Sequence, residues 1–189
     1  MKYLIIFLSL IPMISMSVFF LYGFGIEWFD AFVQWLQNAF GFTFPVVKNK
    51  PYYLSKIAGL SALWIFILAF WVQPLRTYVR FDLVEFKKLL GAFALAYATL
   101  HMVLFFASHQ FALGHIGKLF IDHLFLSVGL GALMVLSIAS QVKSWYKILY
   151  IGVVLVIVHL LLGYRMLEST HIIAVSLLSL GLALRLIKR

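Results

Sequence analysis

The chain is dominated by six apolar runs, each about long enough to cross a lipid bilayer as a helix. They cover roughly residues 3–22, 55–73, 89–108, 123–141, 145–164 and 170–187. Charged residues make up only 11% of the 189 residues, against roughly 25% in soluble domains. We therefore expect an all-α integral membrane bundle of about six transmembrane helices. These runs and their short loops leave no room for a separate soluble domain, so residues 1–189 are predicted to be a single transmembrane domain.

The segment between the first two runs, residues 23–51, has a different pattern. It is rich in aromatic residues at helical spacing, among them Trp28, Phe32, Trp35 and Phe40. An amphipathic stretch of this kind is typical of a helix that lies in the membrane interface. We expect this segment to contact lipid headgroups without crossing the bilayer.

The basic residues are distributed between the apolar runs. If the N-terminus is cytoplasmic, 10 lysines and arginines lie on the cytoplasmic side and 5 on the other side. This bias predicts that both termini are cytoplasmic. The net charge of +9 is dispersed and does not form one patch, which argues against nucleic-acid binding. The absence of cysteine excludes disulfides and thiolate-ligated iron–sulfur clusters.

Two histidines, His101 and His159, lie inside apolar runs, where ionisable groups are costly and usually functional. His101 follows Lys88 by 13 residues and His159 follows Lys147 by 12, which puts both about 18–20 Å from the cytoplasmic boundary. Two imidazoles at one depth on two helices are suited to axial ligation of a haem iron. The alternative is that each is a hydrogen-bonded core residue.

The other four histidines are predicted to have no ligand role. His109 and His115 fall in the outer loop, and His123 and His171 open the fourth and sixth runs, where a histidine can be hydrated. No catalytic motif competes with the histidine pair. The six acidic residues all fall in loops or at the ends of runs, which argues against an ion-coupled pump or transporter.

Several short motifs resemble a known family. They are Ala58-Gly59-Leu60-Ser61-Ala62-Leu63, Pro74-Leu75-Arg76, the pair Lys87-Lys88 followed by Leu89-Leu90-Gly91, Ala98-Thr99-Leu100-His101, Gly117-Lys118, Gly129, and Tyr150 before His159. Over roughly residues 56–165 the chain resembles the MsrQ (YedZ) family of the ferric-reductase-like transmembrane superfamily. The most specific part is the block that ends at His101.

This resemblance implies a function. Members of the family are haem b subunits of the bacterial inner membrane, also associated with FMN. They pass electrons from the quinone pool or a flavin to a periplasmic molybdopterin-containing reductase, MsrP-like, which repairs methionine sulfoxide in proteins. The resemblance implies that His101 and His159 ligate the haem. The catalytic site of such a system would lie on the partner protein.

The chain departs from the family pattern near the cytoplasmic side. Tyr146 stands where the family has a further histidine, 13 residues before His159. Lys87 and Lys88 stand where two-haem members of the superfamily carry a histidine. We therefore expect one haem. The stretch before the fourth run also departs from the family, which leaves the role of His123 open.

Four residues near the cytoplasmic side are candidates for an FMN or quinone site that would feed the haem: Arg76, Lys87, Lys147 and Tyr146. Basic groups suit a flavin phosphate, and aromatic rings suit stacking on a planar cofactor. The alternative is an ordinary positive-inside cluster.

At the other side, Arg165 lies about 9 Å outward from His159 and is a candidate partner for a haem propionate. A snorkelling interfacial arginine is the alternative. Two other functions also stay open at this point. One is a ferric or other metal reductase subunit with the same haem geometry, and the other is a haem-free membrane transporter or assembly factor.

Overall fold

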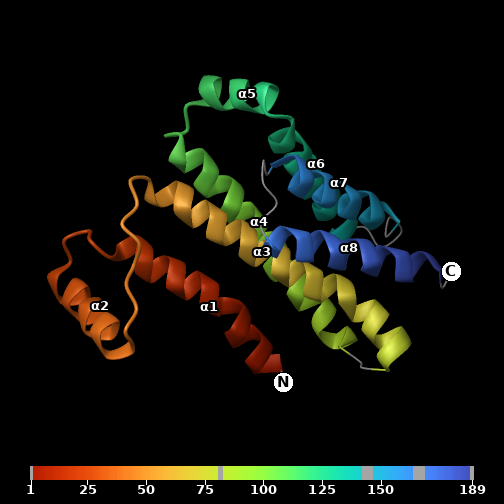
Figure 1. The fold of residues 1–189 in the computed structure, drawn as a ribbon, viewed down its shortest axis with the longest axis horizontal. Coiled ribbons are helices and arrows are strands. Elements are labelled where there is room, and N and C mark those ends of the chain that lie inside the picture. Colours follow the sequence, from red (N-terminus) through yellow and green to blue (C-terminus); the bar gives the residue numbers. More distant parts are fainter. Residues whose placement is uncertain (1, 81–82, 142–146, 164–168, 188–189) are drawn as a thin grey trace.

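A computed structural model describes residues 2–80, 83–141, 147–163 and 169–187. Every regular element in these ranges is a helix (Figure 1). In chain order they are α1 (Lys2–Leu21), α2 (Glu27–Phe40), α3 (Lys50–Pro74), the π-helical turn η1 (Leu75–Val79), α4 (Val84–Ser108), α5 (Leu113–Asp122), α6 (Leu124–Gln141), α7 (Ile148–Gly163) and α8 (Ser169–Ile187). The predicted all-α class is confirmed for the described residues.

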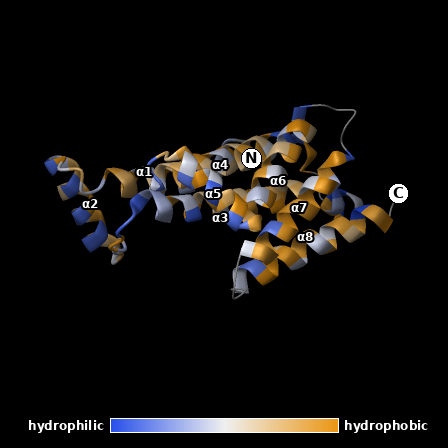
Figure 2. Cartoon of the chain, turned by 90° about the horizontal axis from the view of Figure 1, so that it is seen from above, coloured by the Kyte–Doolittle hydropathy of each residue, from blue (hydrophilic) through white to orange (hydrophobic). Residues whose placement is uncertain are grey.

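Five of the helices, α1, α3, α4, α6 and α8, are long and apolar enough to cross a membrane. The sixth candidate, α7, is strongly apolar but has only 16 residues, and the described residues stop shortly before and directly after it. Figure 2 shows that hydrophobic residues predominate along these helices. The chain is therefore compatible with a multi-pass membrane protein, and the count of about six spans stays a prediction.

The helix boundaries follow the apolar runs with local exceptions. α3 begins at Lys50, earlier than the run itself, because the side chain of Asn49 caps it: the Asn49 Oδ1 accepts from the Tyr52 amide at 3.1 Å. Pro51 in the first turn needs no amide partner and favours the same start. The capping residues thus extend this helix beyond its hydrophobic part.

Two helices lie outside the apolar runs. α2 occurs within the predicted interfacial segment and lies beyond the C-terminal end of α1, apart from the main bundle (Figure 1), with Trp28 and Trp35 exposed. α5 was not expected, because its residues were assigned to the outer loop. It is amphipathic, buries Ile116 and leads directly into α6.

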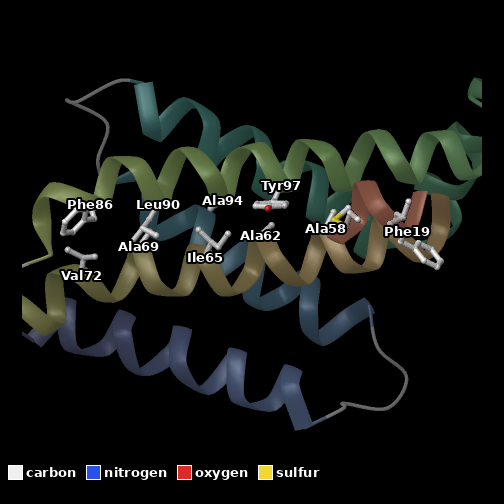
Figure 3. Close-up of a cluster of buried hydrophobic side chains, with 12 residues drawn as sticks. Phe19, Ala58, Ala62, Ile65, Ala69, Val72, Phe86, Leu90, Ala94 and Tyr97 are labelled. Atoms are coloured by element: carbon white, nitrogen blue, oxygen red, sulfur yellow. The ribbon is translucent and has the colours of Figure 1, made fainter. Parts of the chain in front are cut away.

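The bundle is built from two helical hairpins, α3 with α4 and α6 with α7. α8 packs against α3 and α7, α4 also contacts α6, and α1 packs against α3 and α4. Ala58 and Ala62 of α3 and Ala94 of α4 are buried in the first hairpin (Figure 3). Small residues at such positions let helix backbones approach closely, which is how membrane helices commonly associate.

The hydroxyl of Tyr97 connects α4 to the backbone of α1. Tyr97 is buried and donates to the Ser9 carbonyl at 2.7 Å, while the Met13 amide donates to the Tyr97 oxygen at 2.9 Å. In a regular helix Met13 would donate to Ser9 directly. Pro12 lies between these two residues and disturbs the helix. The Tyr97 hydroxyl is thus inserted into the hydrogen-bond ladder of α1.

Replacing Tyr97 with Phe should therefore loosen α1 from the bundle. The change removes two hydrogen bonds to backbone groups of α1, and we expect it to lower the free energy of unfolding by about 1–2 kcal/mol. Unfolding in mixed detergent micelles would measure this loss. Tyr3→Phe is the control, since Tyr3 lies on the same helix α1 and is 85% exposed. Equal stability of the two variants would contradict a structural role for the inserted hydroxyl.

Candidate cofactor site

His101 lies on α4 with its imidazole against α3. Its Nδ1 is 2.7 Å from the Ser55 carbonyl oxygen and 3.0 Å from the Ser55 hydroxyl. The Ser55 hydroxyl in turn donates to the backbone carbonyl of His101 at 3.0 Å. Because a carbonyl can only accept, Nδ1 must carry the hydrogen. Nε2 of the neutral ring then has a free lone pair, which is the form that binds a metal.

His159 repeats this arrangement on the second hairpin. It lies on α7, and its Nδ1 is 2.7 Å from the carbonyl oxygen of Phe125 on α6. The carbonyl again requires a hydrogen on Nδ1 and leaves Nε2 as the acceptor. Both histidines are thus held in the same tautomer by the backbone of the preceding helix in the hairpin.

A glycine makes room for each imidazole. Gly59 follows Ser55 by one helical turn, and Gly129 follows Phe125 by one turn. A Cβ atom at Gly59 would lie 3.0 Å from the His101 Nδ1, and one at Gly129 would lie 2.7 Å from the His159 Nδ1. Both distances are shorter than an ordinary van der Waals contact. The carbonyl and the glycine four residues later therefore form a matching seat for the ring on each hairpin.

The two imidazoles come together in the interior of the bundle. Both are half-buried, and each is bonded through Nδ1 to a carbonyl of the partner helix in its hairpin. The contact between α4 and α6 joins the hairpins that carry them. The inference from sequence that both histidines lie at one depth in the membrane stays a prediction.

The donor set fits a haem iron better than a bare metal ion. Within the described ranges no group of three or more His, Cys, Asp or Glu side chains could hold a metal ion. A haem iron receives four nitrogens from its own macrocycle and needs only axial ligands from the protein. Two imidazoles with the hydrogen fixed on Nδ1 supply such ligands, and their carbonyl partners are the kind of second-shell contact that orients metal-bound histidines.

The remaining histidines differ in their surroundings. His109 and His115 lie at the end of α4 and on α5 with ring centroids 5.5 Å apart, and His123 is exposed between α5 and α6. The expectation that His171 is hydrated at the interface is wrong. Its side chain is only 3% exposed, because it lies on the face of α8 that also buries Ala174.

Other predicted site residues are only partly described. Arg165 and Tyr146 lie outside the described residues. Arg76 and Lys147 are exposed, whereas Lys87 is half-buried on α4. The charge that acts on Lys87 is that of Arg185 on α8, which sequence analysis had counted only as one of the cytoplasmic basic residues. Its position inside an apolar run, between Leu184 and Leu186, is the signal that could have singled it out.

Comparisons of the chain with protein-family models, curated proteins and solved structures found no match. The fold defines the chain as a helical bundle compatible with a multi-pass membrane protein, with two half-buried imidazoles that are each bonded to a backbone carbonyl. A more specific function has to be proposed from the site and from the motif resemblance together.

Proposed function

We propose that this protein is a haem b electron-transfer subunit of the bacterial inner membrane, similar to the MsrQ family. The observation that supports it most is the pair of interior imidazoles, each held by a backbone carbonyl through Nδ1 and each facing a glycine. Two such rings on hairpins that contact each other through α4 and α6 are suited to axial ligation.

The residues of this chain would bind and orient the cofactor. His101 and His159 would supply the axial nitrogens, and a bound haem would provide a one-electron carrier that cycles between ferric and ferrous iron. The carbonyls of Ser55 and Phe125 would keep both rings neutral and raise their basicity as ligands. Apolar helices around the site would exclude water, which favours the redox state of a bound haem that has the lower net charge.

The direction of electron flow and the partners come from the resemblance. Electrons would enter on the cytoplasmic side from the quinone pool or from a flavin such as FMN. They would leave to a periplasmic molybdopterin-containing methionine-sulfoxide reductase. The chain itself would carry no catalytic residue, since the chemistry on the substrate would take place in that partner.

Purification of the full chain after expression with ample haem tests the proposal. We expect a Soret band, reduced α and β bands typical of bis-histidine haem b, and one haem per chain. Reduced protein should be reoxidised by an oxidised periplasmic methionine-sulfoxide reductase. A colourless preparation would refute the proposal and favour a haem-free transporter or assembly factor, and two haems per chain would refute the single site.

A metal reductase is the second candidate, and one observation favours it. The rings of His109 and His115 lie together at the outer end of α4, with centroids 5.5 Å apart. The His109 Nδ1 is occupied by the Phe105 carbonyl at 3.0 Å, which leaves Nε2 for a ligand. If this candidate is correct, Cu(II) should reoxidise the reduced protein, and His109→Ala should slow that reaction without slowing reoxidation by the methionine-sulfoxide reductase.

The charge distribution predicts the topology. A reporter fused after Arg189 should be active in the cytoplasm, and a reporter inserted near Lys118 should be active in the periplasm, because the lysines and arginines favour the cytoplasmic side. Paired alkaline phosphatase and fluorescent protein fusions would measure this. The opposite pattern would place the histidine pair near the cytoplasmic face and reverse the proposed electron flow.

A further inference from the structure

A second group of polar residues lies at the opposite end of the bundle from His109. Lys87 is the fourth residue of α4, Tyr150 is the third residue of α7, and Arg185 is the third residue from the end of α8. Lys87 precedes His101 by 14 residues, which is about 21 Å along α4. The three side chains therefore belong to one end of the bundle, well away from the histidine pair.

Arg185 is held firmly by its neighbours. A terminal nitrogen, Nη2, donates to the carbonyl of Phe70 on α3, and the guanidinium lies 4.1 Å from the centroid of the Phe70 ring. The Tyr150 hydroxyl forms a further side-chain hydrogen bond with it. Nε is buried and has no hydrogen-bond partner among the described residues. The guanidinium is thus fixed in position by neutral groups, none of which balances its charge.

Lys87 brings a second positive charge to the same place. It is half-buried, and the charges of Lys87 and Arg185 repel each other. Among the described residues, no carboxylate is among the groups that act electrostatically on either side chain. Two partly desolvated cations with no carboxylate among the described groups that act on them are unfavourable in a low-dielectric environment. An anion bound between α4 and α8 would relieve this repulsion.

We propose that Lys87, Tyr150 and Arg185 form a binding site for a phosphate group. Arginine and lysine give strong charge-assisted hydrogen bonds to phosphate oxygens, and a tyrosine hydroxyl can donate a further one. The site lies at the ends of apolar helices, where lipid headgroups are found, and basic pockets between membrane helices bind anionic lipids. An anionic phospholipid is therefore the expected source of the phosphate, with free phosphate as the other source. The site does not depend on the haem proposal.

Native mass spectrometry of the full chain in dodecylmaltoside tests this site. Titration with phosphatidylglycerol should give one tightly retained lipid, whereas phosphatidylcholine should be retained weakly. Lys87→Gln and Arg185→Gln should each weaken phosphatidylglycerol retention at least about tenfold, since each removes one charge-assisted contact. Lys88→Gln is the matched control because Lys88 is the next residue on α4 and is exposed.

Inorganic phosphate distinguishes the two sources. Weak competition by millimolar phosphate would assign the site to the lipid headgroup. The site would be assigned to a soluble phosphate compound if the wild type binds phosphate, shows no preference for phosphatidylglycerol, and loses phosphate binding in Lys87→Gln. The proposal would be overturned if Lys87→Gln retained phosphatidylglycerol as well as the wild type does. It would also be overturned if the wild type bound neither phosphatidylglycerol nor inorganic phosphate.

Two further measurements keep the test decisive. If Arg185→Gln does not fold, because the bond to the Phe70 carbonyl is lost, Lys87→Gln and Tyr150→Phe still report on the site. The Soret band gives a separate readout. A Soret band in a Lys87→Gln protein that has lost lipid binding shows that the bundle is intact. A wild type that binds lipid but has no Soret band would refute the haem proposal and leave the phosphate site standing.

Discussion

Alanine in place of His101 or His159 is expected to abolish haem binding. Each residue would supply one axial nitrogen, and alanine has no side-chain donor to replace it. We expect the Soret absorbance per chain to fall below about a tenth of the wild-type value in either variant. Optical spectra and haem extraction from purified protein would measure this loss.

Matched histidine changes separate ligation from a general loss of stability. His115→Ala removes an exposed imidazole from α5 and should leave the spectrum unchanged. Adding free imidazole to His159→Ala should restore part of the Soret band, because an external ligand can occupy the space left by the ring. Full haem retention in both His101→Ala and His159→Ala would refute the site assignment.

The second large effect is expected at Gly129. The Cβ of Gly129→Ala would lie 2.7 Å from both Nδ1 and Cε1 of His159, so the ring must move away from α6. Such a movement breaks the bond between Nδ1 and the Phe125 carbonyl. Changes to second-shell groups of metal sites typically weaken metal affinity about 10- to 100-fold. We expect a loss of haem affinity in this range, measured by haem titration into apoprotein.

Gly131→Ala is the control for this change. Gly131 lies on the same helix, and a Cβ there would have no neighbour within 4 Å. Both substitutions have the same effect on helix propensity, so only contact with the imidazole differs between them. Gly59→Ala should be milder than Gly129→Ala, since its closest contact is 3.0 Å. Equal haem affinity in Gly129→Ala and Gly131→Ala would show that His159 is not seated against α6.

Much of the fold could be predicted from hydropathy alone. The apolar runs correspond to α1, α3, α4, α6, α7 and α8, and the aromatic segment near Trp28 and Trp35 contains α2. α5 was missed because its apolar residues are mixed with glycines and polar residues over only ten positions, a pattern that is difficult to distinguish from a loop. Hydropathy thus indicates which segments are helices but says little about short connecting elements.

The site was only partly predictable for a different reason. The depth of His101 and His159 follows from counting residues along helices, whereas their partners depend on which helices pair. Ser55 and Phe125 act through their backbone carbonyls. Every residue has a backbone carbonyl, so the residue type does not identify the hydrogen-bond partner. Arg185 was not singled out from sequence because its contact with Phe70 requires α8 to pack on α3.

The inserted hydroxyl of Tyr97 has a consequence for how the protein is made. The chain emerges from the ribosome with its N-terminus first, so α1 enters the membrane before α4 has been synthesised. Until then the hydroxyl that joins the amide of Met13 to the carbonyl of Ser9 is absent. Tyr97 precedes His101 by one turn on α4. The arrival of α4 therefore brings the Tyr97 hydroxyl to α1 and His101 to the bundle in one step. Nascent chains that stop short of residue 97 should be degraded by membrane proteases more rapidly than chains that include all of α4.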